Sequence, residues 1–296
     1  MAAVILLTGA TGTVGSAVLR RLVAADRPVR CLVREPKRLG SERVRVQIAL
    51  GDLADPASFR NALRGVDTVV HLAASTRDQS RGSIEELNAM ATLRLVRAAE
   101  RSSAQRFMFF SAIGASLQSP TRFFRTKALA RRAVDSADLS TTVFSASIIY
   151  APGDPWLKLL HRFSYLPAIP VAGSGESVFQ PIWAEDAADC VMAALERGSD
   201  EGRREFELAG PESLSYDEIV HTALRPLGRR RPLLHAPMPL VRSSLRALER
   251  VTGGTTFATP EEAELMEEAM ASTRGTADAE SLGVNPLRMS AVLGGR

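Results

Sequence analysis

The stretch VILLTGATGTVG at residues 4–15 decides the fold. An apolar run at 4–7 is followed at once by Gly9, Gly12 and Gly15, and apolar residues then recur at helical spacing. This order predicts a buried strand, a tight glycine turn and an amphipathic helix. In that context Gly9 forms the turn, and Gly12 allows backbone amides to approach a pyrophosphate. Gly15 allows the helix to pack closely on the strand.

The glycine turn and the start of the helix predict a site for the phosphates of a dinucleotide. The N-terminus of a helix carries a partial positive charge and unpaired amide groups, and both favour an anion. The residues expected to contact the dinucleotide here are Thr8, Gly9, Ala10, Thr11, Gly12, Thr13, Val14 and Gly15. The alternative interpretation is a glycine-rich turn that holds no ligand.

Further apolar runs alternate with helical patterns along the chain. They predict strands at 29–33, 44–50, 66–74, 106–110, 139–149 and 206–209. Strands that alternate with helices at this spacing predict an α/β fold with a doubly wound parallel sheet. We assign the nucleotide-binding domain to residues 1–150, completed by 178–210. A small, mostly helical lobe takes residues 151–177 and 211–296.

The second predicted strand ends at Arg34, which bears on the choice of cofactor. In a dinucleotide fold this position faces the adenosine ribose, and an acid there accepts from the 2′-hydroxyl of NAD. This chain has an arginine, followed by Lys37 and Arg38. A guanidinium matches a 2′-phosphate, so the sequence favours NADP(H) over NAD(H). The alternative is that Arg34 lies along the surface.

The ends of other predicted strands supply further candidate contacts for the cofactor. Asp52 and Leu53 follow the third strand, where Asp52 either accepts from the adenine amino group or stabilises the turn. Ala73 and Ala74 end the fourth strand and permit close approach of the nicotinamide side. Asn88 is the polar residue of the next helix that could face the cleft.

Other features of the sequence narrow the class of protein. The four histidines are isolated, and no Cys/His spacing suits a metal ion. His71 is interpreted as a core residue rather than a catalyst, and Cys31 and Cys190 as small core residues in a reducing compartment. No secretory signal or membrane-spanning run is evident, so a cytoplasmic protein is expected.

The composition is that of a globular protein, with 296 residues, 45% of them hydrophobic and 24% charged. The formal net charge of +4 comes from scattered arginines, which favours solvated faces over a nucleic-acid surface. The expected partner is a small molecule. The sequence leaves open whether the protein is a monomer or a homodimer.

Several motifs together resemble the extended and atypical short-chain dehydrogenase/reductases. They are the glycine turn at 8–15, GDL at 51–53, VVHLAA at 69–74, Ser111, Lys127 and YAPG at 150–153. The stretches 119–134, 173–189 and 206–220 resemble the atypical, NmrA-like and epimerase-like branch near the NADPH-binding accessory subunit of respiratory complex I. The resemblance covers nearly the whole chain.

The resemblance implies a catalytic set from which this chain departs. It implies that Lys127 holds the nicotinamide ribose and that Ser111 hydrogen-bonds the substrate oxygen. In active members a tyrosine four residues before the lysine transfers the proton, but this chain has Phe123 there. Tyr150 is the nearest alternative phenol. The isoflavone-reductase-like branch, which KALARRAV at 127–134 also resembles, is thought to reduce acceptors with lysine and no such tyrosine.

Two functions remain open from the sequence. The first is an NADPH-dependent reductase that transfers a hydride to a small apolar carbonyl, enone or quinone-like acceptor. The apolar segment 156–166 would then form a wall of the substrate site, or else a satellite core of the small lobe. The second is a non-catalytic NADP(H)-binding redox sensor or accessory subunit, as Phe123 suggests. The sequence also predicts helices at 84–101 and at 216–224, the second capped by Ser215. It further predicts a helix start at 259–262 and a mobile stretch at 275–283.

Overall fold

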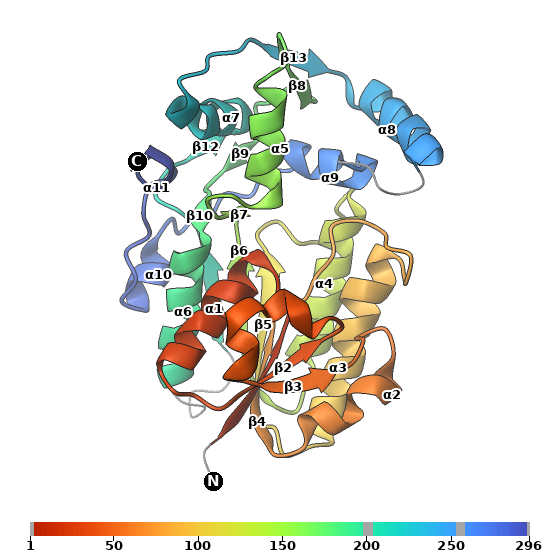
Figure 1. Cartoon of the computed structure of the whole chain (residues 1–296), viewed down its shortest axis with the longest axis vertical. Coiled ribbons are helices and arrows are strands. Elements are labelled where there is room, and N and C mark those ends of the chain that lie inside the picture. The colour runs from red at the N-terminus through yellow and green to blue at the C-terminus, as the bar shows by residue number, and fades with distance from the viewer. Residues whose placement is uncertain (1–2, 198–203, 253–257, 295–296) are drawn as a thin grey trace.

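A computed structural model describes residues 3–197, 204–252 and 258–294. Figure 1 shows a central sheet between helices and, above it, a smaller lobe of helices and short strands. The sheet has the strand order β11-β6-β5-β4-β1-β2-β3, and every neighbouring pair is parallel. This is the doubly wound α/β fold that the sequence predicts.

The central sheet and its helices come from most of the first 208 residues. The strands are β1 (Val4–Thr8), β2 (Val29–Val33), β3 (Gln47–Leu50), β4 (Val66–His71), β5 (Arg106–Ala112), β6 (Ser140–Ala146) and β11 (Arg204–Leu208). The flanking helices are α1 (Thr13–Ala24), η1 (Pro36–Val44), α2 (Pro56–Phe59), η2 (Arg60–Leu63), η3 (Glu85–Met90), α3 (Ala91–Glu100), α4 (Arg122–Asp135) and α6 (Ala184–Glu196).

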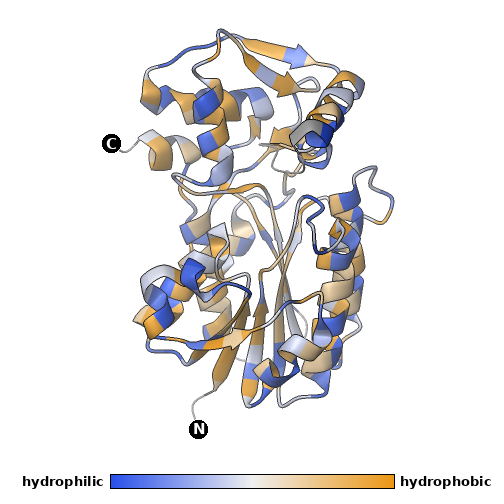
Figure 2. Ribbon diagram, turned by 45° about the vertical axis from the view of Figure 1, so that its right-hand side comes forward, coloured by the Kyte–Doolittle hydropathy of each residue, from blue (hydrophilic) through white to orange (hydrophobic). Residues whose placement is uncertain are grey.

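Both faces of the sheet are buried, which explains the continuous apolar run of the first strand. Ile5 and Leu7 pack in one core with α1 and α6, whereas Leu6 packs in the other with α3 and α4. Successive side chains of a strand point to opposite faces, so a strand covered on both sides needs apolar residues throughout. Figure 2 shows these mostly hydrophobic strands between helices of mixed colour.

Two predicted elements differ from the structure at their N-terminal ends: one strand starts later, and one helix starts with a π-helical turn. The third strand starts at Gln47 rather than at residue 44, because Pro36–Val44 forms the 3₁₀ helix η1. The chain here runs along the edge of the sheet, where Val44 is 81% exposed. The helix predicted at 84–101 opens with the π-helical turn η3 before α3 begins.

The small lobe is built from short elements around its own core. Its strands are β7 (Ile149–Tyr150), β8 (Ile169–Ala172), β9 (Val178–Phe179), β10 (Ile182–Trp183), β12 (Leu214–Ser215) and β13 (Leu233–Ala236). Its helices are α5 (Pro155–Phe163), α7 (Tyr216–Leu224), η4 (Arg225–Leu227), α8 (Met238–Thr252), α9 (Pro260–Glu264), η5 (Leu265–Glu267) and α11 (Met289–Gly294). Tyr150, Leu157, Phe179 and Ile219 are among its buried core residues.

Two helix starts in the small lobe follow from their capping residues. Ser215 accepts from the Glu218 amide at 3.2 Å, and the Glu218 carboxylate accepts from the Ser215 amide at 2.8 Å. Thr259 and Glu262 form the same reciprocal capping box at the start of α9. Each box satisfies two backbone donors, which confirms the helix starts expected at these positions.

The expected mobile stretch at 275–283 is instead a packed element. It contains helix α10 (Ala277–Ser281), and Ala279 and Leu282 are buried in the core shared with α1 and α6. The Asp278 carboxylate also accepts from the backbone amide of Glu207 on β11 at 2.7 Å. Glycines at both ends suggested mobility, but burial of these two side chains holds the segment on the edge of the sheet.

Candidate functional site

A cavity of about 320 Å³ lies at the carboxyl ends of β1 to β4. Ligand pockets commonly start near this volume, and α/β sheets of this kind bind ligands at that end of their strands. Of the residues predicted to contact a cofactor, those that line it are Gly9, Ala10, Thr11, Gly12, Arg34, Arg38, Asp52, Leu53, Ala73 and Ala74. The structure therefore brings the ends of four predicted strands together in one site.

The glycine turn has the tight backbone geometry that the sequence predicts. Gly9 has a φ of +73°, and a Cβ there would lie 2.6 Å from the Ala73 nitrogen. A Cβ on Gly15 would lie 2.0 Å from the Gly9 oxygen, so neither position accepts a side chain without a shift of the backbone. Gly12 is the N-cap of α1 and has no side chain with which to cap it. The amides of the first turn thus remain for an anion such as a pyrophosphate.

Two arginines line the cavity at the end of β2. The Nη1 atom of Arg34 lies 3.4 Å from the Oε1 atom of Gln79, a long and weak contact. Arg38 follows on η1 and lines the same cavity, as does Glu35 between them. Asp52 also lines the cavity, but its carboxylate is paired with Arg81. The two guanidinium groups therefore face one carboxylate that is unpaired among the described residues, that of Glu35, and this end of the cavity suits a phosphate.

Asp52 is already engaged by its own turn. Its Oδ1 atom accepts from the Ala54 amide at 3.0 Å, and its Oδ2 atom pairs with Arg81 at 3.1 Å. Burial raises the pKa of Asp52, but the hydrogen bonds from Ala54 and Arg81 outweigh this and hold it below its usual value. The local role of this carboxylate is therefore visible, whereas a contact with adenine stays a prediction.

Several predicted contact residues do not line the cavity. They are Thr8, Thr13, Val14, Gly15, Asn88 and Lys127. The Asn88 side chain accepts from the Ser75 amide and donates to the Ser75 carbonyl, both at 2.8 Å. Asn88 thus fixes the backbone that enters the loop after β4, and it is Ser75 of that loop, not Asn88, that lines the cavity.

His71 lies in the core, as the sequence indicated. Its Nδ1 atom is 2.6 Å from the Thr8 hydroxyl, and its Nε2 atom is 2.9 Å from the Thr92 hydroxyl. Burial and, to a lesser extent, the charge of Lys127 lower the pKa of His71 to about 3. The ring is therefore neutral at physiological pH and has both nitrogens satisfied.

The Lys127 side chain projects from α4 toward strand β5. Its Nζ atom donates to the carbonyl oxygen of Phe110 at 2.7 Å and lies 5.0 Å from the ring centroid of Phe109. The ring of Phe123, one helical turn earlier, lies 5.8 Å from the same atom. Burial lowers the pKa of Lys127 to about 8, so the ammonium is partly deprotonated just above neutral pH.

Ser111 and Tyr150 each carry a buried hydroxyl that has no hydrogen-bond partner among the described residues. Ser111 follows directly after the carbonyl that binds Lys127, at the end of β5. Tyr150 is fully buried in the small-lobe core, and this burial raises its pKa. Unpaired buried hydroxyls are rare in proteins, and neither of these two residues lines the cavity described above.

The apolar segment 156–166 divides between two environments. Leu157 and Leu160 on α5 are buried in the small-lobe core, whereas Tyr165 is 74% exposed beneath the guanidinium of Arg229. No residue of the segment lines the cavity described above. The interpretation as a satellite core therefore accounts for its buried residues.

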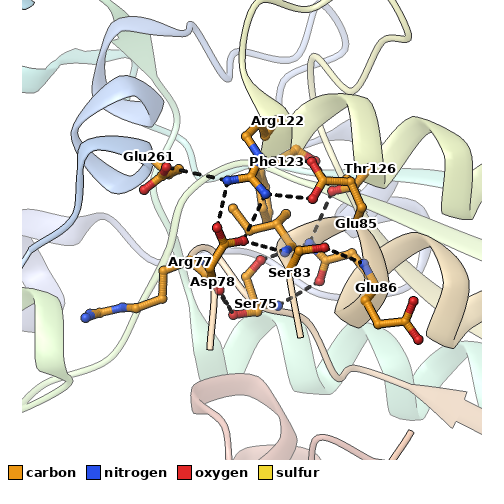
Figure 3. A network of polar contacts seen from close by, with 12 residues as sticks. Ser75, Arg77, Asp78, Ser83, Glu85, Glu86, Arg122, Phe123, Thr126 and Glu261 are labelled. Atoms are coloured by element: carbon orange, nitrogen blue, oxygen red, sulfur yellow. Dashed lines mark hydrogen bonds and ion pairs between the residues drawn. The ribbon is translucent and has the colours of Figure 1, made fainter. Parts of the chain in front are cut away.

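A network of charged side chains, which the sequence did not reveal, surrounds the start of α4 (Figure 3). The Arg122 guanidinium makes two hydrogen bonds of 2.9 Å with Asp78 and bonds of 2.9 and 2.7 Å with Glu85. It also lies 3.6 Å from Glu261 of α9. These hydrogen bonds raise the pKa of Arg122 and lower that of Glu85 to about 2. The acids at the start of α9 are visible in the sequence as part of a helix start. Their pairing with Arg122 could not be predicted, because the two segments lie far apart in the sequence.

Within residues 3–197, 204–252 and 258–294, no three His, Cys, Asp or Glu side chains group so that they could hold a metal ion. Over the same residues, no helix combines the length and the apolar character needed to cross a membrane.

The fold and the cavity define a dinucleotide-binding Rossmann protein, and comparison with known proteins agrees. Residues 9–147 match a family model described as NAD(P)H-binding. The chain is 31% identical to sterol demethylase protein B of Methylococcus capsulatus, over 80% of this chain and 78% of that protein. It therefore belongs to the NAD(P)-binding short-chain dehydrogenase/reductase family, in the atypical and extended branch.

Two further relatives differ in role. An NAD(P)H azoreductase of Xenophilus azovorans is 29% identical over 76% of this chain and 74% of its own length. The mitochondrial NADH dehydrogenase 1 alpha subcomplex subunit 9 of Arabidopsis thaliana is 27% identical over 72% of this chain, and the match spans 55% of that subunit. The relatives thus include both a reductase and a subunit of a respiratory complex.

The likeness to solved structures extends over both lobes. A nucleoside-diphosphate-sugar epimerase of Staphylococcus aureus superposes with a TM-score of 0.77 over 99% of each chain, at 19% identity. At this identity the comparison bears on the fold alone. It shows that the small lobe, like the sheet, follows an arrangement found in this class of protein.

Proposed function

We propose that the protein is an NADPH-dependent reductase that transfers a hydride to a small apolar carbonyl, enone or quinone-like acceptor. The observation that carries this proposal is the unpaired, buried hydroxyl of Ser111 next to the carbonyl held by Lys127. A donor without a partner at this place suits a substrate oxygen that develops negative charge. The reductase among the relatives supports the same class of reaction.

The chain's own residues would act on the acceptor oxygen. When bound, NADPH supplies the hydride that reaches the acceptor carbon. Ser111 donates a hydrogen bond to the acceptor oxygen, and the Lys127 ammonium delivers a proton that it regains from solvent. A pKa of about 8 suits a proton donor near neutral pH. A conjugated acceptor needs a polarised oxygen more than a matched phenol, so this scheme works with Phe123.

The preference for NADP(H) rests on Arg34 and Arg38. Both line the cavity at the end of β2, where an acid would favour NAD. The long contact from Arg34 to Gln79 leaves its guanidinium able to turn toward a 2′-phosphate. Two arginines at one phosphate provide charge-assisted hydrogen bonds that NAD cannot use.

The experiment combines nucleotide binding with turnover. Fluorescence titration should show tighter binding of NADPH than of NADH, and a panel of quinones, enones and aldehydes should reveal consumption of NADPH. Lys127→Met and Ser111→Ala should each lower the rate constant by about 10²-fold. The Ser116→Ala variant, at a half-buried serine outside the cavity lining, serves as the control. With Lys127 as donor, the rate should fall as the pH rises through about 8.

A second candidate is a non-catalytic NADP(H)-binding sensor or accessory subunit. Phe123 favours it, because a phenyl ring carries no proton, and so does the likeness to a respiratory complex subunit. Tight binding of NADPH without consumption on any acceptor of the panel would support this candidate and contradict the reductase.

A further inference from the structure

The loop at residues 75–83, which follows β4, reaches both the cavity and the small lobe. Its first residue, Ser75, lines the cavity, and both backbone polar groups of this residue are held by Asn88. The Asn88 amide also donates to the Thr126 hydroxyl of α4 at 3.2 Å. The root of the loop is thus fixed, and the rest of the loop extends from it.

Two residues of the loop, Gln79 and Arg81, contact residues that line the cavity. Gln79 lines the cavity and contacts Arg34 at the end of β2. Arg81 pairs with Asp52 at the end of β3 at 3.1 Å. The loop therefore touches the two strand ends between which the adenosine half of a dinucleotide would lie.

The other side of the loop is attached to α9 of the small lobe. The Glu262 carboxylate accepts from the Arg77 Nε atom at 3.0 Å and from the Thr76 hydroxyl at 2.9 Å. Asp78 binds Arg122, which in turn lies 3.6 Å from Glu261 (Figure 3). Arg122 directly precedes Phe123, so the attachment also reaches the helix that carries Lys127.

These attachments are suited to opening and closing. The side chains of Arg77 and Glu262 are 35% and 25% exposed, and ion pairs of this kind contribute little stability each. Such weak bonds hold α9 in place but break readily, and a ligand that orders one side of the loop favours the contacts on its other side.

We propose that the 75–83 loop couples nucleotide binding to the docking of α9, with Arg77 and Glu262 as the positioning residues of this contact. The inference rests on the proposed function, because it requires a nucleotide in the cavity. A bound nucleotide orders Gln79 and Arg81, which places Arg77 against Glu262. Docked α9 in turn tightens binding of the nucleotide, because linkage between two sites is reciprocal. Since differences in affinity mostly appear in the dissociation rate, the nucleotide should leave more slowly.

The test uses Arg77→Met, Glu262→Gln and their double variant in the full chain. Glutamine at position 262 still completes the capping box of α9, so the helix start is preserved. Stopped-flow fluorescence should show NADPH leaving each single variant about three- to tenfold faster than the wild type, and the double variant no faster than the singles. Glu205→Gln, which disrupts the comparably exposed pair with Arg131, should leave the rate unchanged.

Hydrogen exchange gives the second readout. NADPH should slow amide exchange at residues 259–268 in the wild type but not in Arg77→Met. The inference would be overturned if both single variants released NADPH at the wild-type rate. It would also be overturned if amide exchange at 259–268 in the wild type were the same with and without NADPH. A wild-type protein that binds no NADPH would overturn the proposed function itself, and this inference with it.

Discussion

The Nζ atom of Lys127 donates to the Phe110 carbonyl at 2.7 Å and lies 5.8 Å from the ring centroid of Phe123. The two α4 residues are one helical turn apart, so they share a face of the helix. The Lys127 ammonium is therefore held by the Phe110 carbonyl and lies near the rings of Phe109 and Phe123. A tyrosine at position 123 would place its phenol ring beside this ammonium. In the proposed reductase, Lys127 would act without the tyrosine that the family resemblance implies at position 123.

Restoring the phenol tests that relationship directly. We expect Phe123→Tyr to raise NADPH-dependent reduction of simple ketones by about 10²-fold, because a positioned general acid contributes roughly this much. Steady-state assays at saturating NADPH measure the change, with Phe163→Tyr in the small lobe as the matched control. A variant that binds NADPH normally and still reduces no ketone would show that more than the phenol is missing.

Arg34 should decide between the two nicotinamide cofactors. We expect Arg34→Ala to weaken NADPH binding by about 10- to 100-fold while NADH binding changes little, because only NADPH has a 2′-phosphate for the guanidinium. Fluorescence titrations with both nucleotides give the ratio. Arg43→Ala, an exposed arginine of η1 outside the cavity lining, is the control. An unaltered NADPH/NADH ratio would contradict the assignment of this residue.

Gly15 should be intolerant of even one methyl group. A Cβ there would lie 2.0 Å from the Gly9 oxygen, so the turn must move before α1 can pack. We expect Gly15→Ala to lower the free energy of unfolding by about 1–3 kcal/mol and to weaken nucleotide binding. Gly294→Ala, where a Cβ meets nothing within 4 Å, is the control in urea denaturation. Equal stability of the two variants would refute the close packing of strand and helix.

His71 should make the fold sensitive to acid. Its pKa is about 3 in the folded protein and near 6.5 when unfolded, so unfolding takes up a proton between these values. This contribution to the free energy of unfolding is fully present above about pH 6.5 and declines by roughly 1.4 kcal/mol per pH unit as the pH falls toward 3. Urea denaturation across this range should show a shallower slope for His71→Gln, and an identical slope would contradict the assignment.

The sequence predicted the parts of the fold whose signals are local. The first strand, turn and helix follow from glycines beside an apolar run, and the starts of α7 and α9 follow from capping boxes only four residues long. Pairing between distant short segments left no such signal. For example, β8 (Ile169–Ala172) and β13 (Leu233–Ala236) form a parallel pair through backbone hydrogen bonds. The side chains of these two segments contain no pattern from which the pairing could be predicted.

The candidate site was predictable to the same extent. The ends of four parallel strands must meet at one edge of the sheet, so residues as distant as Gly9 and Ala73 could be assigned to one cavity. Side-chain partners could not be assigned in this way. Asn88 was expected to face the cleft but is occupied by Ser75, and the acids that bind Arg122 come from three separate segments.

The edge strand β11 and helix α10 have a consequence for how the protein is made. Phe206, Leu208, Ala279 and Leu282 complete a core that also contains Ile5 and Leu7, which are synthesised long before them. The core around β1 therefore stays incomplete until residues 206–282 have been synthesised. We expect nascent chains stalled before residue 204 to be cleaved readily by protease, and chains stalled well past residue 282 to resist it.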